Sequence, residues 1–365
     1  MSLPPRPLHL AVALDAPRRP GAPAAYAPAA YAPAPSDTAH FDAAHFVALA
    51  RLAERGGLGF VTLGDSFARP GLDALAVLAR VAPATERIGL VPAVTTTHTE
   101  PFHVSTAVAT LDWVSHGRAG WSVEVSTTEA DAALFGRRGA APPAEVWREA
   151  GEVADAAARL WDSWEDDAEI RDRASGRFID RDKLHHVDFT GSSFSVRGPS
   201  IVPRPPQGRP VVVVEMTAAG EDAAAPTDPV VGEVAAAHAD VALVRAEDPG
   251  TAGAARAELR ARARGHGRDP GHLLVLASLP VDLESPADAA GLAELLGDWH
   301  AAGAADGFHL RPADPARDLA LLVDGTVPVL RHRGLLRRFD PGATLREHLG
   351  LPRPASRYAP AREAS

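Results

Sequence analysis

The chain has 365 residues, of which 46% are hydrophobic and 23% charged, the balance of a globular protein with a substantial core. Its formal net charge is −10, so a general attraction to nucleic-acid phosphates is not expected. It has no cysteine, which excludes disulfide bonds, thiolate metal sites and a cysteine nucleophile.

Short apolar segments with the length and composition of buried strands alternate with longer helical patterns. The predicted strands are Leu8–Leu14, Phe60–Gly64, Ile88–Val94, Gly120–Val125, Val211–Val214, Val241–Val244, Leu273–Leu279 and Gly307–Leu310. The predicted helices are Ala43–Arg55, Ala74–Val81, His103–Val114, Glu145–Trp164, Val231–His238, Gly253–Gly265 and Ala287–Ala302. Because parallel neighbours need crossover helices, this alternation predicts an α/β fold, a (β/α)8 TIM barrel, with an open doubly wound sheet as the alternative.

Three segments fall outside this alternation. Residues Ala16–Thr38 are rich in Ala and Pro and are expected to form a mobile loop after the first strand. Residues Asp166–Pro210 are long and irregular. Residues 352–365 are expected to be a disordered tail, and residues 1–351 a single domain.

Neither a signal peptide nor a membrane span is expected. The apolar stretch near the N-terminus is short, and no run of about 18 apolar residues occurs. A cytoplasmic protein fits these features. No metal site is expected either, because the adjacent His185 and His186 would point to opposite sides of a strand.

Several blocks carry a more specific signal. They are ARLAERGGLGFVTLGDSF (Ala50–Phe67), ATERIGLVPAVTTTHTEPFHVS (Ala84–Ser105), LDWVSHGRAGWSVEVS (Leu111–Ser126), LWDSWEDDA (Leu160–Ala168), FSVRGPSIVPRPPQGRPVVVV (Phe194–Val214), GAADGFHLRP (Gly303–Pro312) and TLREHLGLPRP (Thr344–Pro354). In this order they resemble the luciferase-like flavin-dependent monooxygenases, in particular the nitrilotriacetate and dibenzothiophene-sulfone monooxygenase branch.

The resemblance implies a barrel of the bacterial-luciferase type and an FMN-dependent enzyme. Reduced FMN would come from a separate NAD(P)H:flavin reductase, and O2 would oxygenate a small organic substrate. The deazaflavin F420 is a less favoured cofactor. Luciferase-like barrels often pair, so a homodimer is compatible with the resemblance. The resemblance assigns no catalytic side chain.

The resemblance also implies residues near the flavin ring, at the ends of strands. Asp65 would lie beside the ring, although it could instead cap the next turn. Thr95, Thr96 and Thr97 would approach the polar edge of the ring, although threonine is also common in strands. Ser122 stands where the family usually has asparagine, so its contact would be weaker. His98 and His309 also lie at strand ends.

At the implied phosphate site the chain departs from the family. Trp147 replaces a tyrosine, and Pro143 replaces a histidine one helical turn earlier. Thr217 is the nearest substitute for a phosphate-binding serine. The acidic residues Glu215, Glu221 and Asp222 follow Val214 and would oppose a phosphate.

A helical insert that covers the barrel mouth in the family is missing here near Pro280. These departures predict weak binding of oxidised FMN. They also leave an alternative function, a barrel that has lost productive flavin use and acts as a non-catalytic binding or regulatory subunit.

Overall fold

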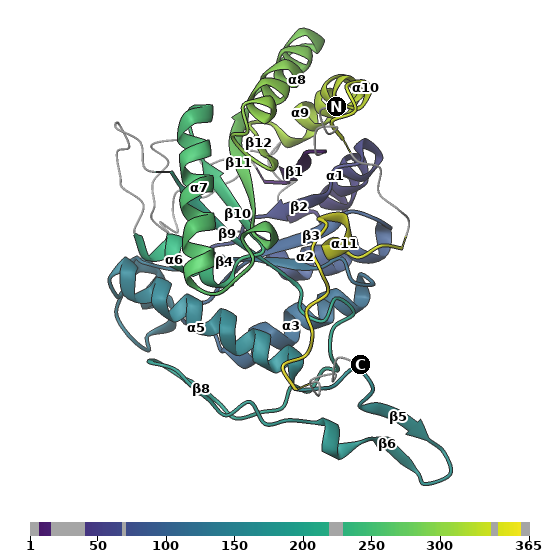
Figure 1. Ribbon diagram of the computed structural model, residues 1–365, viewed down its shortest axis with the longest axis vertical. Helices are drawn as coiled ribbons and strands as arrows, with labels where there is room; N and C mark the ends of the chain where they lie inside the picture. Colours follow the sequence, from purple (N-terminus) through teal and green to yellow (C-terminus); the bar gives the residue numbers. More distant parts are fainter. Residues whose placement is uncertain (1–6, 16–40, 68–70, 219–228, 337–341, 359–365) are drawn as a thin grey trace.

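Eight parallel strands close into a barrel in the computed structural model, which describes residues 7–15, 41–67, 71–218, 229–336 and 342–358 (Figure 1). The barrel strands are β1 (His9–Ala13), β2 (Phe60–Leu63), β3 (Gly89–Thr95), β4 (Gly120–Glu124), β9 (Val211–Thr217), β10 (Val241–Arg245), β11 (Leu274–Val281) and β12 (Gly307–Pro312). Pairing of β1 with both β2 and β12 completes the circle. The predicted barrel is confirmed, and the open-sheet alternative is wrong.

Helices connect the strands and cover the outside of the barrel, and a short last helix lies at its base (Figure 1). They are α1 (Ala43–Gly56), α2 (Ala74–Val81), α3 (Pro101–Val114), α4 (Glu129–Phe135), α5 (Pro143–Asp162), α6 (Pro229–His238), α7 (Pro249–Gly265), α8 (Pro286–Ala301), α9 (Pro315–Leu321), α10 (Val327–His332) and α11 (Leu345–His348). All seven predicted helices are present. Five of them begin at a proline, one to four residues before the predicted start. Proline fits the first helical position because the N–H that it lacks would have no partner within the helix there.

The sequence did not predict the short elements. The prediction missed helix α4, helices α9 and α10 after β12, and helix α11. The irregular stretch 166–210 contains two small hairpins, β5 (Glu169–Asp172) with β6 (Arg177–Ile179) and β7 (Phe189–Thr190) with β8 (Ser195–Val196). Such short strands carry too few residues for a periodic signal.

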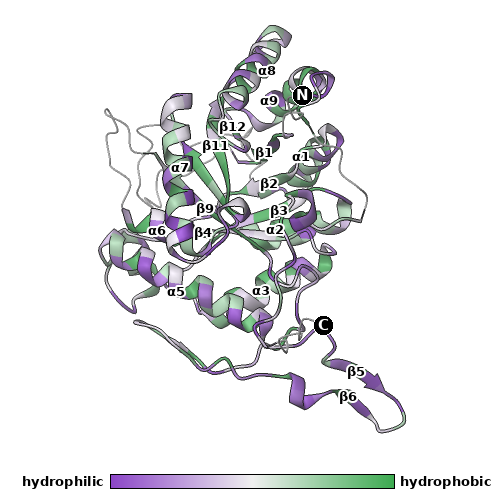
Figure 2. Cartoon of the chain, viewed as in Figure 1, coloured by the Kyte–Doolittle hydropathy of each residue, from purple (hydrophilic) through white to green (hydrophobic). Residues whose placement is uncertain are grey.

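The barrel interior is packed with aliphatic side chains, and the strands are the most apolar part of the fold (Figure 2). Leu345, Leu349 and Leu351 close the end of the barrel where the strands begin. Gly307 allows β12 to approach β1, since a Cβ there would lie 2.1 Å from the His9 carbonyl oxygen. The opposite end, where the strands finish, is left for a site.

A buried polar network fixes α11 against the base of the barrel. Arg346 donates to both carboxylate oxygens of Asp240, at 3.1 and 2.7 Å, and Asp240 in turn accepts the backbone N–H of Val212 on β9. Gln207 accepts the backbone N–H of Arg346 and donates to Asp112. Arg346 and Asp240 form a buried ion pair, whereas Asp112 is met by amide donors and burial raises its pKa to about 6.

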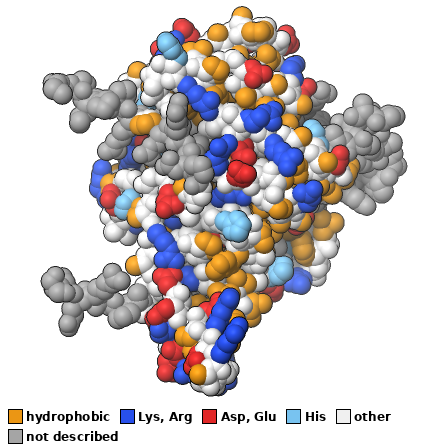
Figure 3. Space-filling model, turned by 90° about the vertical axis from the view of Figure 1, so that its right-hand side faces the viewer, with side chains coloured by type: hydrophobic (Ala, Val, Ile, Leu, Met, Phe, Trp, Pro, Cys, Tyr) orange, Lys and Arg blue, Asp and Glu red, His pale blue; other side chains and the backbone are white. Residues whose placement is uncertain are grey.

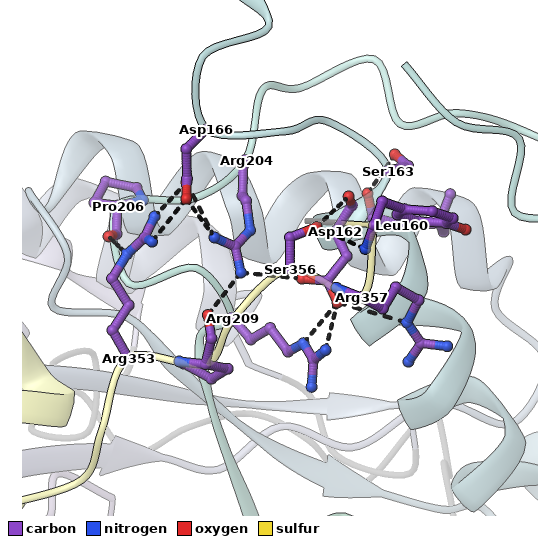
Figure 4. Close-up of polar contacts among 12 residues, drawn as sticks. Leu160, Asp162, Ser163, Asp166, Arg204, Pro206, Arg209, Arg353, Ser356 and Arg357 are labelled. Carbon is purple, nitrogen blue, oxygen red and sulfur yellow. Dashed lines mark hydrogen bonds and ion pairs between the residues drawn. The ribbon is translucent and has the colours of Figure 1, made fainter. Parts of the chain in front are cut away.

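A second network binds the C-terminal segment to the end of α5 (Figure 4). Asp162 is fully buried and receives hydrogen bonds from Arg204 and Arg209. Asp166 receives two from Arg204 and two from Arg353. Arg204 therefore bridges two carboxylates and also donates to the carbonyl oxygen of Pro354.

These contacts correct the expectation of a disordered tail over 352–365. Residues 352–358 lie against the barrel, since Ser356 donates to the carbonyl oxygen of Asp162 and the backbone N–H of Arg357 donates to its carboxylate. Residues 359–365 lie outside the described residues, as does the expected loop Ala16–Thr38.

The exterior mixes basic and acidic side chains on the face seen in Figure 3. The arginine-rich helix α7 follows this pattern, because Arg256 and Arg260 both contact Asp306 and Arg262 contacts Glu258. No described helix has the length and apolar character needed to cross a bilayer.

Replacing Asp162 by Asn should lower the free energy of unfolding by about 3 kcal/mol, because it leaves buried guanidinium groups without their counter-charge. Glu258→Gln is the control, since its pair with Arg262 is exposed and should contribute less than about 0.5 kcal/mol. Urea denaturation of the two variants measures both effects. Equal losses would contradict the role given to the buried network.

Acid should release the contacts of Asp166. Hydrogen bonds from Arg353 lower the pKa of Asp166 to about 2, from 3.8 in an unperturbed chain. A lowered pKa in the folded state stabilises the fold above pH 4, and this contribution disappears as the pH falls towards 2. The difference in free energy of unfolding between the natural chain and Asp166→Asn should therefore shrink over that interval. A difference that stays constant from pH 5 to pH 2.5 would argue against it.

Candidate active site

The carboxyl ends of the barrel strands surround a cavity of about 370 Å³. Because the strands are parallel, the residues at their ends meet at one rim. On three strands the lining residues are two positions apart, since alternate side chains of a strand face the same way. These pairs are Ser122 and Glu124 on β4, Leu243 and Arg245 on β10, and His309 and Arg311 on β12.

His309 forms the floor of the cavity with Thr62, and its ring contacts hydroxyl groups from two other strands. Its Nε2 lies 2.9 Å from Thr62 Oγ1 on β2, and its Nδ1 lies 3.0 Å from Ser278 Oγ on β11. Burial lowers the pKa of His309 to about 4. The imidazole is therefore neutral at physiological pH, and both of its nitrogens are engaged.

Charged side chains lie nearer the rim. Glu215 on β9 accepts a hydrogen bond of 2.6 Å from Arg245. Among the described residues, no carboxylate forms a hydrogen bond with Arg311, and its buried Nε has no hydrogen-bond partner. Burial and the neighbouring Arg245 lower the pKa of Arg311. Glu215 opposes this shift, so the described residues compensate the charge of Arg311 only in part.

Asp65 lies at the rim and serves the fold as well. Its carboxylate accepts the backbone N–H of Ala74, the first residue of α2, at 3.0 Å. Asp15 accepts the backbone N–H of Gly64 in a similar way. Both aspartates line the cavity. The capping role that the sequence suggested for Asp65 is present, and it does not remove the residue from the site.

The other sequence-predicted ring contacts divide into two groups. Ser122 lines the cavity. The three threonines at the end of β3 are buried and are not part of its lining. Thr96 Oγ1 donates to the carbonyl oxygen of Glu124, and Thr97 Oγ1 accepts the backbone N–H of Ser126, so both hydroxyls join β3 to the end of β4.

The sequence-predicted phosphate contacts lie away from this lining. Trp147 is partly buried on α5 and packs against the apolar cluster between that helix and the barrel. Thr217 is the exposed last residue of β9. Pro143 is the first residue of α5, and Glu221 and Asp222 lie outside the described residues.

Two further histidine positions can now be placed. His98 has a backbone φ of 68° and stacks on Phe135, with its buried Nδ1 lacking a hydrogen-bond partner. His185 contacts Glu165 at 2.8 Å and stacks on Tyr358. In the described parts of the chain, no three potential metal ligands gather.

Sequence reasoning missed Thr62, Glu124, Arg245, Ser278 and Arg311, which line the cavity or support its floor. A signal was available, because polar residues two apart at the end of an apolar strand indicate one face that turns from core to site. The pairs in GWSVE and GFHLRP have this spacing.

The connection after β11 is short. Only residues 282–285 separate that strand from α8, and Ser285 caps the helix in a capping box with Asp288. The barrel thus closes without a helical insert at this position.

A family model described as "Luciferase-like monooxygenase" matches residues 22–325. Nitrilotriacetate monooxygenase component A of Aminobacter aminovorans is 29% identical over 85% of this chain and 90% of its own length. One chain of the pristinamycin IIA synthase of Streptomyces pristinaespiralis, by name a subunit, is 34% identical, with 85% of this chain and 89% of its own length covered.

Among solved structures, an EDTA monooxygenase from Chelativorans sp. BNC1 shares the fold with a TM-score of 0.78 at 21% identity, covering 95% of this chain and 99% of that one. The alignment with the nitrilotriacetate enzyme extends over 419 positions, more than the length of this chain, so that relative has segments absent here. The alignment with the synthase chain extends over 317 positions.

Arg311→Met should leave the free energy of unfolding unchanged or raise it by up to about 1 kcal/mol, because it removes a buried N–H without a partner. Arg118→Met is the control. The Arg118 guanidinium donates five hydrogen bonds to groups that include the carbonyl oxygens of Ile88 and Ala82, so its loss should cost about 2–4 kcal/mol. Thermal and urea unfolding measure both. A large destabilisation by Arg311→Met would mean that Arg311 serves the fold.

Proposed function

The chain belongs to the luciferase-like monooxygenase family, and on this premise we propose that it is an FMN-dependent monooxygenase. The flavin ring binds in the cavity at the carboxyl ends of the strands. Reduced FMN reaches it from a separate NAD(P)H:flavin reductase, and O2 then oxygenates a small organic substrate.

The observation that carries this proposal is Arg311 at the mouth of the cavity, whose buried Nε has no hydrogen-bond partner among the described residues. A group with acceptor atoms and negative charge is needed to satisfy that guanidinium. The pyrimidine edge of a flavin has such acceptors, at N1 and the two carbonyl oxygens, beside a single N3–H donor. The cavity matches this edge with donors from Arg311 and Ser122 and with acceptors from Asp65 and Glu124.

The size of the cavity also suits a planar ring. Its volume of about 370 Å³ lies within the usual range of small-molecule sites, which is roughly 300–1,000 Å³. Apolar side chains of Ala13, Ala93 and Leu243 line it between the polar groups. A riboflavin lyase with the same fold, at a TM-score of 0.76 and 21% identity, is described with a modified FMN, which supports the choice of cofactor.

Each residue has a separate task in this proposal. When bound, reduced FMN supplies the electrons that activate O2. Arg311 balances negative charge on the reduced ring, and Asp65 accepts the N3–H and orients the ring in its plane. Ser122 contributes a weaker contact. Thr95, Thr96 and Thr97 support the ring from behind, since their strand end holds β4 in place.

The phosphate end of FMN is bound less tightly than the ring. Trp147 and Thr217 approach the phosphate, but neither offers the charge of an arginine or lysine. We therefore expect oxidised FMN to bind weakly and reduced FMN to bind more tightly, because only the reduced ring gains from the charge of Arg311. Such a preference fits an enzyme that takes up reduced FMN from a reductase and releases the oxidised form.

The partners follow from this division of labour. The related nitrilotriacetate enzyme is by name a component and the related synthase chain is part of a larger synthase, which supports a multi-part system with a reductase. A cytoplasmic location would give access to NAD(P)H, and a homodimer is compatible with the fold. Neither the comparisons nor the described residues favour the non-catalytic alternative.

Asp65→Asn should weaken binding of reduced FMN about tenfold, because an amide replaces a charged acceptor. Asp73→Asn is the matched control, since Asp73 also accepts a backbone N–H at the start of α2 but does not line the cavity. Anaerobic titration of both variants and of the natural chain with FMN and reduced FMN measures the effect. Equal weakening by the two substitutions would assign Asp65 to the helix alone, and no binding of either form of FMN by the natural chain would refute the proposed function.

A further inference from the structure

Three side chains at and directly behind the cavity floor form a hydrogen-bonded set. Thr62, Ser278 and His309 come from three different strands, and all three are at least nine-tenths buried. His309 lies between the two hydroxyls, with contacts of 2.9 Å to Thr62 and 3.0 Å to Ser278. Only Thr62 and His309 border the cavity, whereas Ser278 lies behind them.

The number of protons on the ring limits how this set can be arranged. A neutral imidazole has one N–H donor and one acceptor nitrogen. One hydroxyl must therefore donate to the ring while the other accepts from it. The two possible arrangements differ in which hydroxyl retains a proton to donate elsewhere.

The surroundings of Ser278 decide between them. Ser278 is 1% exposed, and its hydroxyl has no hydrogen-bond partner other than His309 in the described structure. If it accepted from the ring, its own proton would be buried without an acceptor, which is unfavourable. Ser278 therefore donates to Nδ1, and the ring proton lies on Nε2.

Thr62 must then accept a hydrogen bond from Nε2. Its hydroxyl proton is left over, and the only contact of this hydroxyl in the described structure is His309. Because Thr62 borders the cavity, the proton has an open direction towards a bound molecule.

We propose that His309 is a positioning residue that fixes the Thr62 hydroxyl as a hydrogen-bond donor to the ligand at the cavity floor. The ligand therefore presents an acceptor atom to the floor, a carbonyl oxygen or an unprotonated ring nitrogen. This rests on the proposed function, in which that acceptor belongs to the flavin ring. Ser278, behind the floor, sets the direction of both hydrogen bonds of His309.

Burial supports a fixed direction over the working pH range. It lowers the pKa of His309 to about 4, and Arg311 and Arg245 act in the same sense, while Glu215 opposes them. A doubly protonated ring would donate from both nitrogens and reverse the Ser278 contact. With both nitrogens occupied and no proton to exchange near neutrality, His309 orients a donor and does not itself transfer protons.

Nuclear magnetic resonance of the natural chain tests the proton order directly. Long-range proton–nitrogen correlations of 15N-histidine-labelled protein distinguish the two neutral tautomers, and the spectrum of His309→Gln identifies the signals of His309. The expected result is a neutral Nε2–H tautomer between pH 6 and 8. A neutral Nδ1–H tautomer or a charged ring would overturn the proposal, and neither result depends on flavin binding.

A pair of matched variants tests the ligand contact. Thr62→Val keeps the shape of the side chain but removes the hydroxyl, and should weaken FMN binding about tenfold; Thr62→Ser keeps the hydroxyl and should stay within about twofold of the natural chain. Infrared spectra of bound FMN should show a carbonyl stretch at higher frequency in Thr62→Val only.

The outcomes separate the two proposals. Equal affinities and carbonyl frequencies in both variants would overturn the donor role of Thr62. If the natural chain binds no FMN, the flavin ligand and the proposed function fail together, whereas the tautomer measurement still decides the orientation of the floor.

Discussion

Parallel closure of the barrel is the constraint on which the rest of the structure depends. Once β1 pairs with both β2 and β12, every strand ends at the same rim, and side chains from strands distant in the sequence must meet there. The strands satisfy one another's backbone groups, so no edge remains to be covered. The fold thus creates one end for stability and one end for chemistry.

Buried charged side chains at the base and at the mouth of the barrel differ in their hydrogen-bond partners. At the base, Asp112, Asp162 and Asp240 are buried, and each meets arginine or amide donors with little left unsatisfied. At the mouth, Arg311 has no hydrogen-bonded carboxylate among the described residues, and His98 near the end of β3 has a positive φ and a nitrogen without a partner. Because Arg311 borders the cavity, a ligand there can complete its hydrogen bonding.

Side chains at or near the cavity also hold the fold together. Asp65 caps the start of α2 and borders the cavity, and Thr96 and Thr97 fasten β3 to the end of β4 just outside the lining. Anchoring site residues in secondary-structure contacts holds them rigid, which a preorganised site needs. It also explains why capping and binding interpretations of the same residue are compatible.

The sequence alone determined the order of strands and helices. Apolar segments of strand length and helical periodicity are local patterns, which can be recognised without knowing which elements pack together. Its ordered blocks also predicted the barrel type and several rim residues, of which Asp65 and Ser122 do line the cavity. Only the tertiary structure decided that residues 352–358 are held by Asp162 and Asp166, and that His309 lies between Thr62 and Ser278. Those contacts join residues up to 247 positions apart, and they depend on strand register and side-chain direction, which no local pattern encodes.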